Sequence, residues 1–322
     1  MGAETGLARR VSGMKDKLVV LFGGGGFVGR YVAQALLATG ARVRIAQREP
    51  KSAFFLKPLG GLGQTQFVAA DVRKPDSVAR AVAGADAVVN LVGAFADMTA
   101  LHVAGAKAIA EAASAAGVGT LVHVSAIGAD PDSPSEYGRS KGEGEAAVSA
   151  AFPNATILRP SLVFGREDEF TNRFAAMIAR MPVVPVLRGS AKFQPVYVKD
   201  VARVVVAALA DPKAFAGRTL DLGGPDVLTM RQIHEFLAGA VLRHPPMPDL
   251  PDAVGSAIAS LGFLPGAPIT RDQWVMLGRD NVVTGEDGLA AAGITPTPMA
   301  AVAPDWLVRF RRQGRFAKRA TA

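Results

Sequence analysis

The chain has 322 residues, of which 49% are hydrophobic, so it is long and apolar enough to bury a large core and is not expected to be disordered. It contains no cysteine, which excludes disulfides, thiolate metal sites and cysteine nucleophiles. The formal net charge is +8, and the four scattered histidines lack metal-ligand spacing, so we expect them in the core or on the surface.

Much of the positive charge lies near the two ends of the chain. Residues 1–16 are expected to form an N-terminal tail, and residues 307–322 a basic C-terminal tail with interleaved aromatic side chains. Such a tail suits an anionic membrane surface or an acidic partner protein, and it could equally be solvated and disordered. No nucleic-acid-binding module accompanies the charge, so no nucleic-acid partner is expected.

Neither a membrane span nor a signal peptide is visible in the sequence. No apolar run reaches the roughly 18 residues that a transmembrane helix needs. The first residues carry charges and lack an apolar segment of the kind found in signal peptides. We therefore expect a soluble or peripheral protein on the cytosolic side.

From Lys17 onward, short runs rich in β-branched residues alternate with segments whose apolar residues have helical spacing. Strands are expected at residues 17–23, 42–48, 65–71, 87–93, 120–126 and 155–165. Helices are expected at residues 27–40, 77–84, 100–117 and 142–152. This order predicts an α/β fold, a Rossmann-type doubly wound parallel sheet with helices on both faces.

The alternation loosens in the second half of the chain. We expect residues 17–165 to form an NAD(P)-binding domain, and residues 166–306 a mixed region that completes the sheet and forms a smaller lobe. The stretch 244–268 is rich in proline and glycine, which indicates irregular connections. Asp200 and Thr229 each precede a helical pattern and are expected to be N-caps.

The first predicted strand ends in a glycine-rich loop that opens a helix. Gly23, Gly26 and Gly29 have GxxGxxG spacing, which provides a tight turn and room for a pyrophosphate at the amino end of the helix. The loop lies in the first βαβ unit, and this context favours a dinucleotide site over an ordinary turn. The residues expected to line the nucleotide here also include Phe27, Val28 and Arg30.

The ends of the second and third strands bear on the choice of nucleotide. The second strand ends in Gln47-Arg48, and Arg48 suits the 2′-phosphate of NADP, so NADPH is favoured over NADH. The alternative is that Arg48 is an ordinary surface residue and Glu49 binds a ribose hydroxyl. Asp71, followed by Val72, ends the third strand, where its carboxylate could accept from the adenine amino group or cap the next turn.

Leu91, Val92 and Gly93 follow the fourth strand, beside the expected path of the cofactor. Ser125 ends the fifth strand, and Tyr137 and Lys141 follow a short loop with the spacing that places two side chains on one helical face. Lys141 is expected to lower the pKa of Tyr137, which could then act as general acid or base while Ser125 bonds the reacting oxygen. Alternatively, Tyr137 and Lys141 only bind the ribose.

These motifs resemble the short-chain dehydrogenase/reductase superfamily in its extended and atypical branch. The resemblance rests on "GGGGFVGR", "NLVG", "HVSAIGAD", "YGRSK", "LRPSLVFG" and "FQPVYVKDVA". It implies that Ser125, Tyr137 and Lys141 match the catalytic residues of that superfamily. It also implies that Pro160 shapes a loop near the nicotinamide.

Longer stretches resemble the NADPH-binding accessory subunit of respiratory complex I, in its alphaproteobacterial form. They are "HVSAIGADPDSPSEYGRSKGEGE", "QPVYVKDVA" and "ITRDQWVMLGRDNVV" followed by "GITPT". The resemblance implies a tightly bound NADPH with a structural role and complex I subunits as partners. It implies a peripheral position near the quinone entry, on the cytoplasmic face of a bacterial inner membrane.

Two other functions remain open from the sequence. The intact Ser125, Tyr137 and Lys141 are compatible with a free, cytoplasmic NADP-dependent oxidoreductase or epimerase. A sensor that binds NADP without reducing anything is the third hypothesis, although such proteins usually lose the tyrosine or the lysine. Co-purification with membranes at low salt would separate the accessory subunit from the free enzyme.

Overall fold

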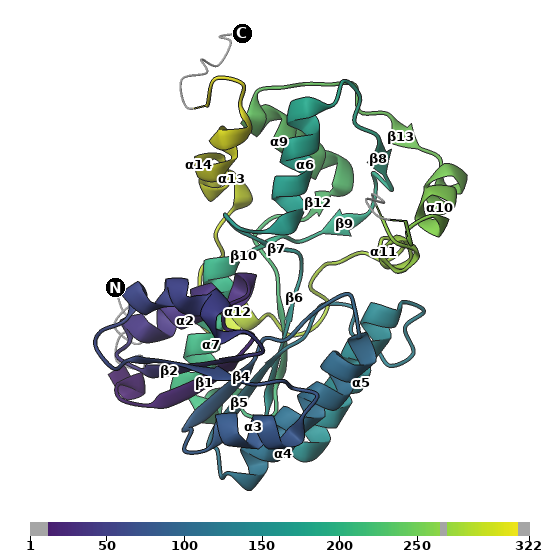
Figure 1. Cartoon of the computed structure of the whole chain (residues 1–322). Helices are drawn as coiled ribbons and strands as arrows, with labels where there is room; N and C mark the ends of the chain where they lie inside the picture. Colours follow the sequence, from purple (N-terminus) through teal and green to yellow (C-terminus); the bar gives the residue numbers. More distant parts are fainter. Residues whose placement is uncertain (1–11, 265–268, 315–322) are drawn as a thin grey trace. The chain divides into compact units, whose positions relative to one another are not determined.

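The computed structural model describes residues 12–264 and 269–314, and within them the chain forms two compact units (Figure 1). Unit 1 takes its described residues from Met1–Pro160, Val198–Leu222 and Val283–Thr295. Unit 2 takes its described residues from Ser161–Tyr197, Gly223–Val282 and Pro296–Ala322. Each unit is thus assembled from separated segments of the sequence.

The described part of unit 1 contains a seven-stranded parallel sheet in the order β11-β6-β5-β4-β1-β2-β3. Apart from β11 at one edge, this is the Rossmann order, so the predicted fold class is confirmed. The strands are β1 (Leu18–Phe22), β2 (Arg42–Gln47), β3 (Thr65–Ala69), β4 (Ala87–Asn90), β5 (Thr120–Val124), β6 (Thr156–Pro160) and β11 (Thr219–Leu222).

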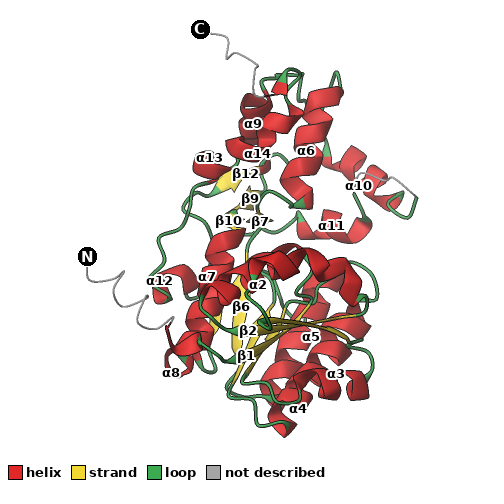
Figure 2. Cartoon of the chain, turned by 60° about the vertical axis from the view of Figure 1, so that its left-hand side comes forward, coloured by secondary structure: helices red, strands yellow, loops and turns green. Residues whose placement is uncertain are grey.

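Helices cover both faces of this sheet (Figures 1 and 2). The helix α2 packs against α7, and α4 packs against both α3 and α5. The helices of unit 1 are η1 (Ser12–Met14), α2 (Phe27–Ala38), η2 (Pro50–Leu59), α3 (Pro75–Val82), η3 (Thr99–Gly105), α4 (Ala106–Ala115), α5 (Glu136–Ala151), α7 (Val198–Ala210), α8 (Pro212–Phe215) and α12 (Gly288–Ala291).

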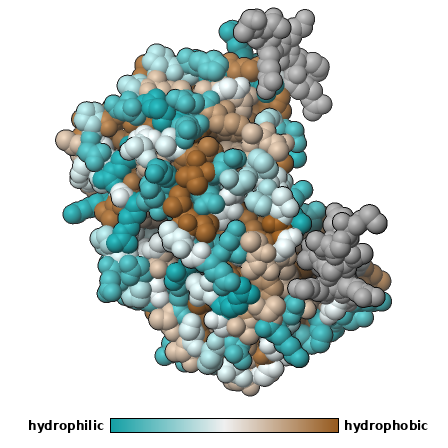
Figure 3. Space-filling view, turned by 180° about the vertical axis from the view of Figure 1, so that it is seen from behind, coloured by the Kyte–Doolittle hydropathy of each residue, from teal (hydrophilic) through white to brown (hydrophobic). Residues whose placement is uncertain are grey.

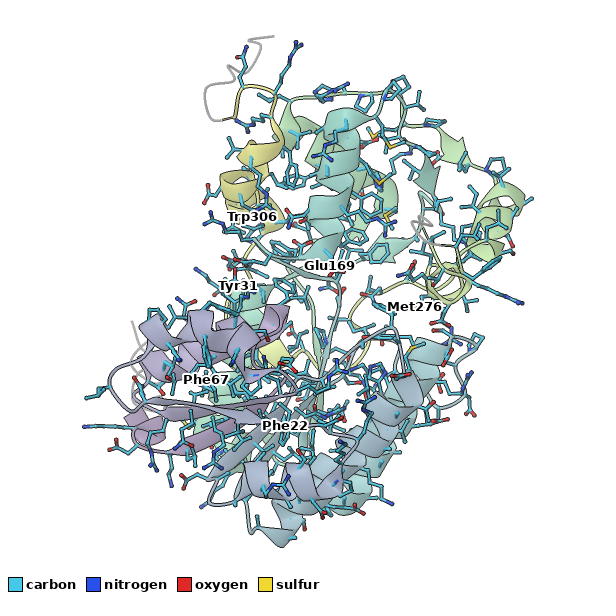
Figure 4. All side chains as sticks on the ribbon, in the orientation of Figure 1. Phe22, Tyr31, Phe67, Glu169, Met276 and Trp306 are labelled. Carbon is cyan, nitrogen blue, oxygen red and sulfur yellow. The ribbon has the colours of Figure 1, made fainter. Side chains whose placement is uncertain are left out.

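The covering helices explain why the central strand β1 is apolar throughout. All residues of β1 are buried, and one core cluster joins Val20, Phe22 and Val88 of the sheet to Ile109 of α4 and Val148 of α5. Phe22, labelled in Figure 4, is fully buried in this cluster. A strand covered on both faces reads as a continuous apolar run, which is the pattern that predicted it.

The sixth predicted strand, 155–165, is wrong in its second half. The ladder of the main sheet stops at Pro160, and Val163–Phe164 form a separate strand, β7, which pairs with β10 of unit 2. Pro160 has no N–H to donate, and Ser161 donates from Oγ to the carbonyl of Asn281 (2.8 Å). The chain therefore leaves unit 1 immediately after Pro160.

Within its described residues, unit 2 contains three two-stranded sheets, which pair β7 with β10, β8 with β13 and β9 with β12. Its strands are β7 (Val163–Phe164), β8 (Val186–Leu187), β9 (Lys192–Phe193), β10 (Val196–Tyr197), β12 (Leu228–Thr229) and β13 (Asp249–Leu250). Its helices are α6 (Glu169–Arg180), α9 (Met230–Val241), α10 (Asp252–Ser260), α11 (Arg271–Met276), α13 (Met299–Val302), α14 (Pro304–Leu307) and η4 (Val308–Phe310).

The two predicted N-caps differ in outcome. Thr229 caps α9 with a complete capping box, in which its side chain accepts from the Gln232 N–H and the Gln232 side chain accepts from the Thr229 N–H. The prediction for Asp200 is wrong, because α7 already begins at Val198. Asp200 lies inside the first turn, where its buried carboxylate contacts Arg203 at 3.3 Å.

The described parts of both expected tails are folded. Met14 of η1 is buried, and the Asp16 N–H donates to the Gly40 carbonyl. Near the other end, Arg309 donates to Asn172 Oδ1 (2.7 Å) and Arg311 Nε donates to the Ala240 carbonyl (2.8 Å). The basic residues from 315 onward lie outside the described residues.

Figure 3 shows one face of the surface. The face drawn in Figure 3 carries hydrophobic areas separated by hydrophilic side chains (Figure 3). Among residues 12–264 and 269–314, no helix combines the length and hydropathy that crossing a membrane would require.

Candidate functional site

The glycine loop is packed so closely that side chains at several of its positions would clash or strain the backbone. Gly23 has φ of +79°, and a Cβ on it would lie 3.2 Å from the Leu91 carbonyl at the end of β4. A Cβ on Gly29 would lie 2.3 Å from the Gly23 carbonyl oxygen, so α2 starts directly against the loop. Gly26 is the N-cap of α2, whose N-terminus has no side-chain cap. The amino end of α2 can therefore receive an anion.

Gln47, the last residue of β2, holds this loop in shape. Its Oε1 accepts from the Gly25 N–H (3.0 Å), and its Nε2 donates to the Glu49 carbonyl (2.8 Å) and to Ser52 Oγ (2.7 Å). The glycine loop and the start of η2 are thus tied through one amide. The sequence indicated Gln47 only as the neighbour of Arg48, because the spacing of residues does not show that its amide bonds to the glycine loop.

The residues expected near the adenosine lie at the ends of β2 and β3. Arg48 is exposed, and it has no hydrogen bond or ion pair to another described residue. Arg30, in the first turn of α2, stacks its guanidinium on the Phe55 ring of η2, with 4.6 Å from Cζ to the ring centroid. The half-buried side chains of Phe27 and Val28 open the same helix.

Asp71 is already engaged at the end of β3. Both of its carboxylate oxygens accept from Arg73, at 3.0 Å and 2.8 Å, and this pairing lowers the pKa of Asp71 to about 2. Its Oδ1 also accepts from the Arg73 N–H (3.1 Å), so Asp71 organises its own turn and is not the N-cap of α3, which is Lys74. The neighbouring Val72 is buried against Gly105.

The segment after β4 lies beside the glycine loop. The Leu91 N–H donates to the Phe22 carbonyl (3.0 Å), and Asn90 Oδ1 accepts from the Val92 N–H (3.0 Å). A Cβ on Gly93 would lie 3.6 Å from Lys141 Nζ. The residues that follow β4 therefore contact the glycine loop at Leu91 and approach Lys141 at Gly93.

Ser125 and Lys141 meet at the end of β5. Ser125 is buried, and its Oγ has no hydrogen-bond partner among the described residues. Lys141 Nζ makes only a long contact, 3.5 Å, to the carbonyl of Val124, the residue before Ser125. Burial lowers the pKa of Lys141 to about 8, against a smaller opposing effect of Glu145. Both polar groups therefore have hydrogen-bonding capacity that a ligand could satisfy.

Tyr137 is the one predicted site residue whose expected chemistry is corrected. Its pKa was expected to be lowered by Lys141, but burial raises the pKa of Tyr137 to about 12. Lys141 Nζ lies 5.8 Å from the Tyr137 ring centroid, and its own pKa is lowered. The phenol is thus held in its neutral, proton-donating form at neutral pH.

The helix that carries Tyr137 and Lys141 is packed through its glycines. Ser135 caps α5 by accepting from the Gly138 N–H (3.2 Å), so the helix begins before Tyr137. A Cβ on Gly142 would lie 2.4 Å from the backbone of Asp130, and one on Gly144 would lie 2.2 Å from the His102 carbonyl. These glycines are unfavourable in a helix but permit close backbone packing on both sides.

A partly buried ion pair lies one turn beyond Lys141. Arg159 of β6 donates to both carboxylate oxygens of Glu145, at 2.9 Å from Nε and 2.5 Å from Nη2, and this pairing raises the pKa of Arg159. The next residue, Pro160, accepts at its carbonyl from the Ile127 N–H (3.0 Å). The pair fixes α5 against β6 and was not singled out from the sequence, because its partners are 14 residues apart.

The arrangement as a whole fits a dinucleotide. The glycine loop leaves no room for a Cβ, the amino end of α2 can face phosphates, and Ser125 and Lys141 present buried polar atoms nearby. Bound nicotinamide would supply hydride-transfer chemistry. The chain's own residues would hold the phosphates (Gly23 to Gly29), hold ribose hydroxyls (Lys141) and present a proton (Tyr137).

Comparison with known proteins agrees with this site. Residues 19–223 match the NAD dependent epimerase/dehydratase family, and the chain belongs to that family. Its NAD(P)-binding Rossmann fold is shared by the NADPH-dependent quinone oxidoreductase QOR2 of Escherichia coli, solved with NADPH. The two have a TM-score of 0.73 and 19% identity over 90% of this chain and 99% of that one. Likeness at this identity shows the fold alone.

Two relatives define the branch of the family. The chain is 36% identical over 312 residues to NADH dehydrogenase (ubiquinone) 1 alpha subcomplex subunit 9, mitochondrial, of Mus musculus, covering 93% of this chain and 82% of the relative. The protein of the same name from Arabidopsis thaliana is 36% identical over 79% of this chain and 66% of its own length. The predicted resemblance to complex I accessory subunits is therefore confirmed as homology.

A third relative is named as an enzyme. A ceramide reductase of Caulobacter vibrioides is 34% identical over 199 residues, which cover 61% of this chain and 62% of the relative.

Proposed function

We propose that the chain is an accessory subunit of respiratory complex I that binds NADPH as a structural group and turns over no substrate. The observation that carries this proposal is the 36% identity to the mouse subunit, which extends over 93% of the chain and therefore across both units. Its partners would be the other subunits of complex I. The site supplies the second support, because its glycine loop and buried lysine suit tight binding.

The preference for NADPH rests on Arg48. Arg48 is exposed and directly follows β2. The preceding residue, Gln47, bonds to the glycine loop at Gly25, so Arg48 lies close to that loop. A planar cation that bonds no other described residue suits the 2′-phosphate, which NAD lacks. Glu49 is the residue that would instead bind a ribose hydroxyl of NAD. The proposal therefore predicts that replacing Arg48 weakens NADPH binding and leaves NADH binding unchanged.

The proposed location is the cytoplasmic face of a bacterial inner membrane, as a peripheral protein near the quinone-entry region. It rests on the basic residues that end the sequence, which would meet an anionic lipid surface. In the described part, Arg309 and Arg311 already donate to groups of unit 2. The cations proposed for the membrane are therefore Arg312, Arg315, Lys318 and Arg319.

Isolation from native membranes tests the proposal. A tag on the C-terminus would be used to purify the protein, which would then be denatured to identify the released nucleotide and the accompanying proteins. We expect about one NADPH per chain together with complex I subunits. A lone soluble protein with exchangeable NADP would overturn the assembly proposal, and absence of nucleotide would overturn the cofactor proposal.

A free NADP-dependent reductase is the second candidate, favoured by the ceramide reductase relative and by the complete set of Ser125, Tyr137 and Lys141. In such an enzyme Tyr137 would donate its proton to the oxygen of a carbonyl substrate while Ser125 donates a hydrogen bond to that oxygen. This candidate predicts release from membranes at all salt concentrations and loss of turnover in Tyr137→Phe. Salt-dependent membrane association would speak against it.

A further inference from the structure

Phe95 covers the ring of Tyr137. It lies in the loop between β4 and η3, its side chain is 59% exposed, and its ring stacks on Tyr137 with 4.9 Å between centroids and 25° between planes. Exposing a large aromatic side chain in a loop brings no core stabilisation, whereas the stack shields one face of the phenol. The position of the Phe95 ring therefore affects which molecules can reach that face of Tyr137.

The loop that carries Phe95 is anchored to the helix that carries Tyr137 by one imidazole. The N–H of Ala94, next to Phe95, donates to His102 Nε2 (3.1 Å). The other ring nitrogen, Nδ1, lies 2.9 Å from Ser140 Oγ, and the Ser140 hydroxyl donates to the Tyr137 carbonyl (3.0 Å). A relay of three hydrogen bonds thus runs from the Phe95 loop to the Tyr137 backbone.

The direction of the relay is determined by its ends. A backbone N–H can only donate, so His102 Nε2 must be the unprotonated acceptor, and the neutral ring carries its proton on Nδ1. The Nδ1–H then donates to Ser140, which leaves the Ser140 hydroxyl free to donate onward. Burial, reinforced by the charge of Lys141, lowers the pKa of His102 to about 4, so the ring is neutral at physiological pH.

His102 is closely surrounded by α5 and Tyr137. It lies in η3, a π-helix, and π-helices are rare and often mark functional sites. The backbone of α5 touches this turn at Gly144, where a Cβ would lie 2.2 Å from the His102 carbonyl. The His102 ring also meets Tyr137 edge-on, with 5.5 Å between centroids and 88° between planes. Phe95 and His102 therefore enclose Tyr137 from two sides.

We propose that Phe95 is the specificity-determining residue that excludes carbonyl substrates from Tyr137, and that His102 is the positioning residue that holds the Phe95 loop closed. The inference deepens the proposed function and rests on it, because it takes Tyr137 as a residue of the nucleotide site. It accounts for a chain that retains Ser125, Tyr137 and Lys141 without turning over a substrate. One face of the Tyr137 ring is covered from within the chain.

Nitration by tetranitromethane tests the cover without requiring any nucleotide. The chain has three tyrosines, Tyr31, Tyr137 and Tyr197, and all three are half-buried, so the other two serve as internal references. Nitration of each would be followed by peptide mass spectrometry on the purified full chain at neutral pH. Removing the Phe95 ring should expose the phenol and lower the pKa of Tyr137 by about one unit. We therefore expect Phe95→Ala to accelerate nitration of Tyr137 about tenfold. Tyr31 and Tyr197 should be unaffected.

Matched variants separate shielding from general loosening. Phe263→Ala removes an aromatic ring that is 78% exposed in unit 2 and should leave Tyr137 nitration unchanged. His102→Phe keeps a ring but removes both hydrogen bonds, so we expect it to reproduce most of the acceleration. His102→Gln can accept from Ala94 and donate to Ser140 through one amide, so it should restore slow nitration.

Two results would overturn the inference. One is equal nitration of Tyr137 in the wild-type and Phe95→Ala proteins. The other is equal nitration rates in His102→Phe and the wild type, which would remove the positioning role. Neither result depends on complex I or on NADPH, so failure here and failure of the proposed function are distinguishable. The proposed function fails only if no nucleotide or no partner subunits accompany the protein from native membranes.

Discussion

Two buried charged side chains, one from each unit, differ in how their own chain satisfies them. Asp168, the N-cap of α6 in unit 2, accepts from the Gly165 N–H, the Thr171 N–H and the Thr171 hydroxyl, at 3.0, 2.5 and 2.5 Å. Lys141, in α5 of unit 1, is equally buried but has only a 3.5 Å contact to the Val124 carbonyl. A charge satisfied by its own chain stabilises the fold, whereas one left unsatisfied is available to a ligand.

The same contrast extends to neutral polar atoms. Next to Lys141, Ser125 Oγ has no partner among the described residues, and the same holds for His123 Nε2, whose other nitrogen accepts from Asn90. Unit 2 also buries unpartnered ring nitrogens, on His234 and Trp306, but these belong to an apolar cluster of aliphatic and aromatic side chains. An unpartnered polar atom alone therefore does not indicate a site. In unit 1 the site is indicated because such an atom, Ser125 Oγ, lies next to the buried charge of Lys141.

The largest expected effect compares a glycine from each unit. In Gly29→Ala the new Cβ would lie 2.3 Å from the Gly23 carbonyl, so we expect a loss of about 3 kcal/mol in stability and at least about a hundredfold weaker nucleotide binding. Gly239→Ala in α9 meets nothing within 4 Å and should stabilise the protein by about 0.5 to 1 kcal/mol. Urea unfolding and nucleotide titration measure both, and similar effects at the two positions would contradict the contrast.

A pH dependence should follow from Lys141. Its pKa is lowered from 10.5 to about 8 in the folded chain, so between these values the unfolded chain binds a proton that the folded chain does not. Stability without nucleotide should therefore rise with pH across this window, by up to about 3 kcal/mol, relative to Lys141→Met, which lacks the group. Urea unfolding of both proteins from pH 7 to pH 10 measures the difference. A constant difference would show that the ammonium is not desolvated.

Exchanging the two charges for neutral residues should produce opposite phenotypes. Asp168→Ala leaves two backbone donors and a hydroxyl without their acceptor, so we expect about 2 kcal/mol less stability and unchanged nucleotide affinity. Lys141→Met should lower nucleotide affinity at least about tenfold without loss of stability at pH 7. These expectations are tested by measuring denaturant midpoints and nucleotide dissociation constants on the same preparations. Loss of stability in Lys141→Met would mean that the lysine is structural.

The smallest expected effect concerns the edge of the site. Arg48→Ser should weaken NADPH binding about tenfold and leave NADH binding unchanged, because the side chain would contact only the 2′-phosphate. Lys51→Ser, in the exposed start of η2, is the matched loss of a nearby charge and should change neither. Equal losses for both nucleotides would show that Arg48 has no part in discriminating them.

Local patterns predicted most of the fold because they follow from local physics. Alternating apolar runs predicted the sheet of unit 1, and GxxGxxG predicted a loop in which a Cβ on Gly29 would clash. Patterns failed where the partner is distant. The strand that continued past Pro160 breaks because Ser161 and Leu162 bond to Asn281, over a hundred residues later. Local polarity at Asp200 suggested a cap, but the helix begins two residues earlier.

The sequence predicted which types of residue form the candidate site, but it did not predict their pKa shifts correctly. Spacing placed Tyr137 and Lys141 on one helix, yet it gave no measure of burial, which raises the pKa of Tyr137 instead of lowering it. Gln47, Phe95 and His102 were missed as participants, because their roles depend on which loops meet in space. An amide, an exposed aromatic residue and a scattered histidine carry no such signal in one sequence.

The segmented composition of unit 1 has a consequence for biosynthesis. The edge strand β11 pairs with β6 only after Thr219–Leu222 has been made, and Asp221 then accepts from the N–H groups of Thr284 and Gly285. Contacts of such long sequence separation close late, so a nascent chain that has left the ribosome only as far as Pro160 exposes the unpaired edge of β6. A gene truncated after the sixth strand would encode the glycine loop, Tyr137 and Lys141, but not a sheet able to shelter them.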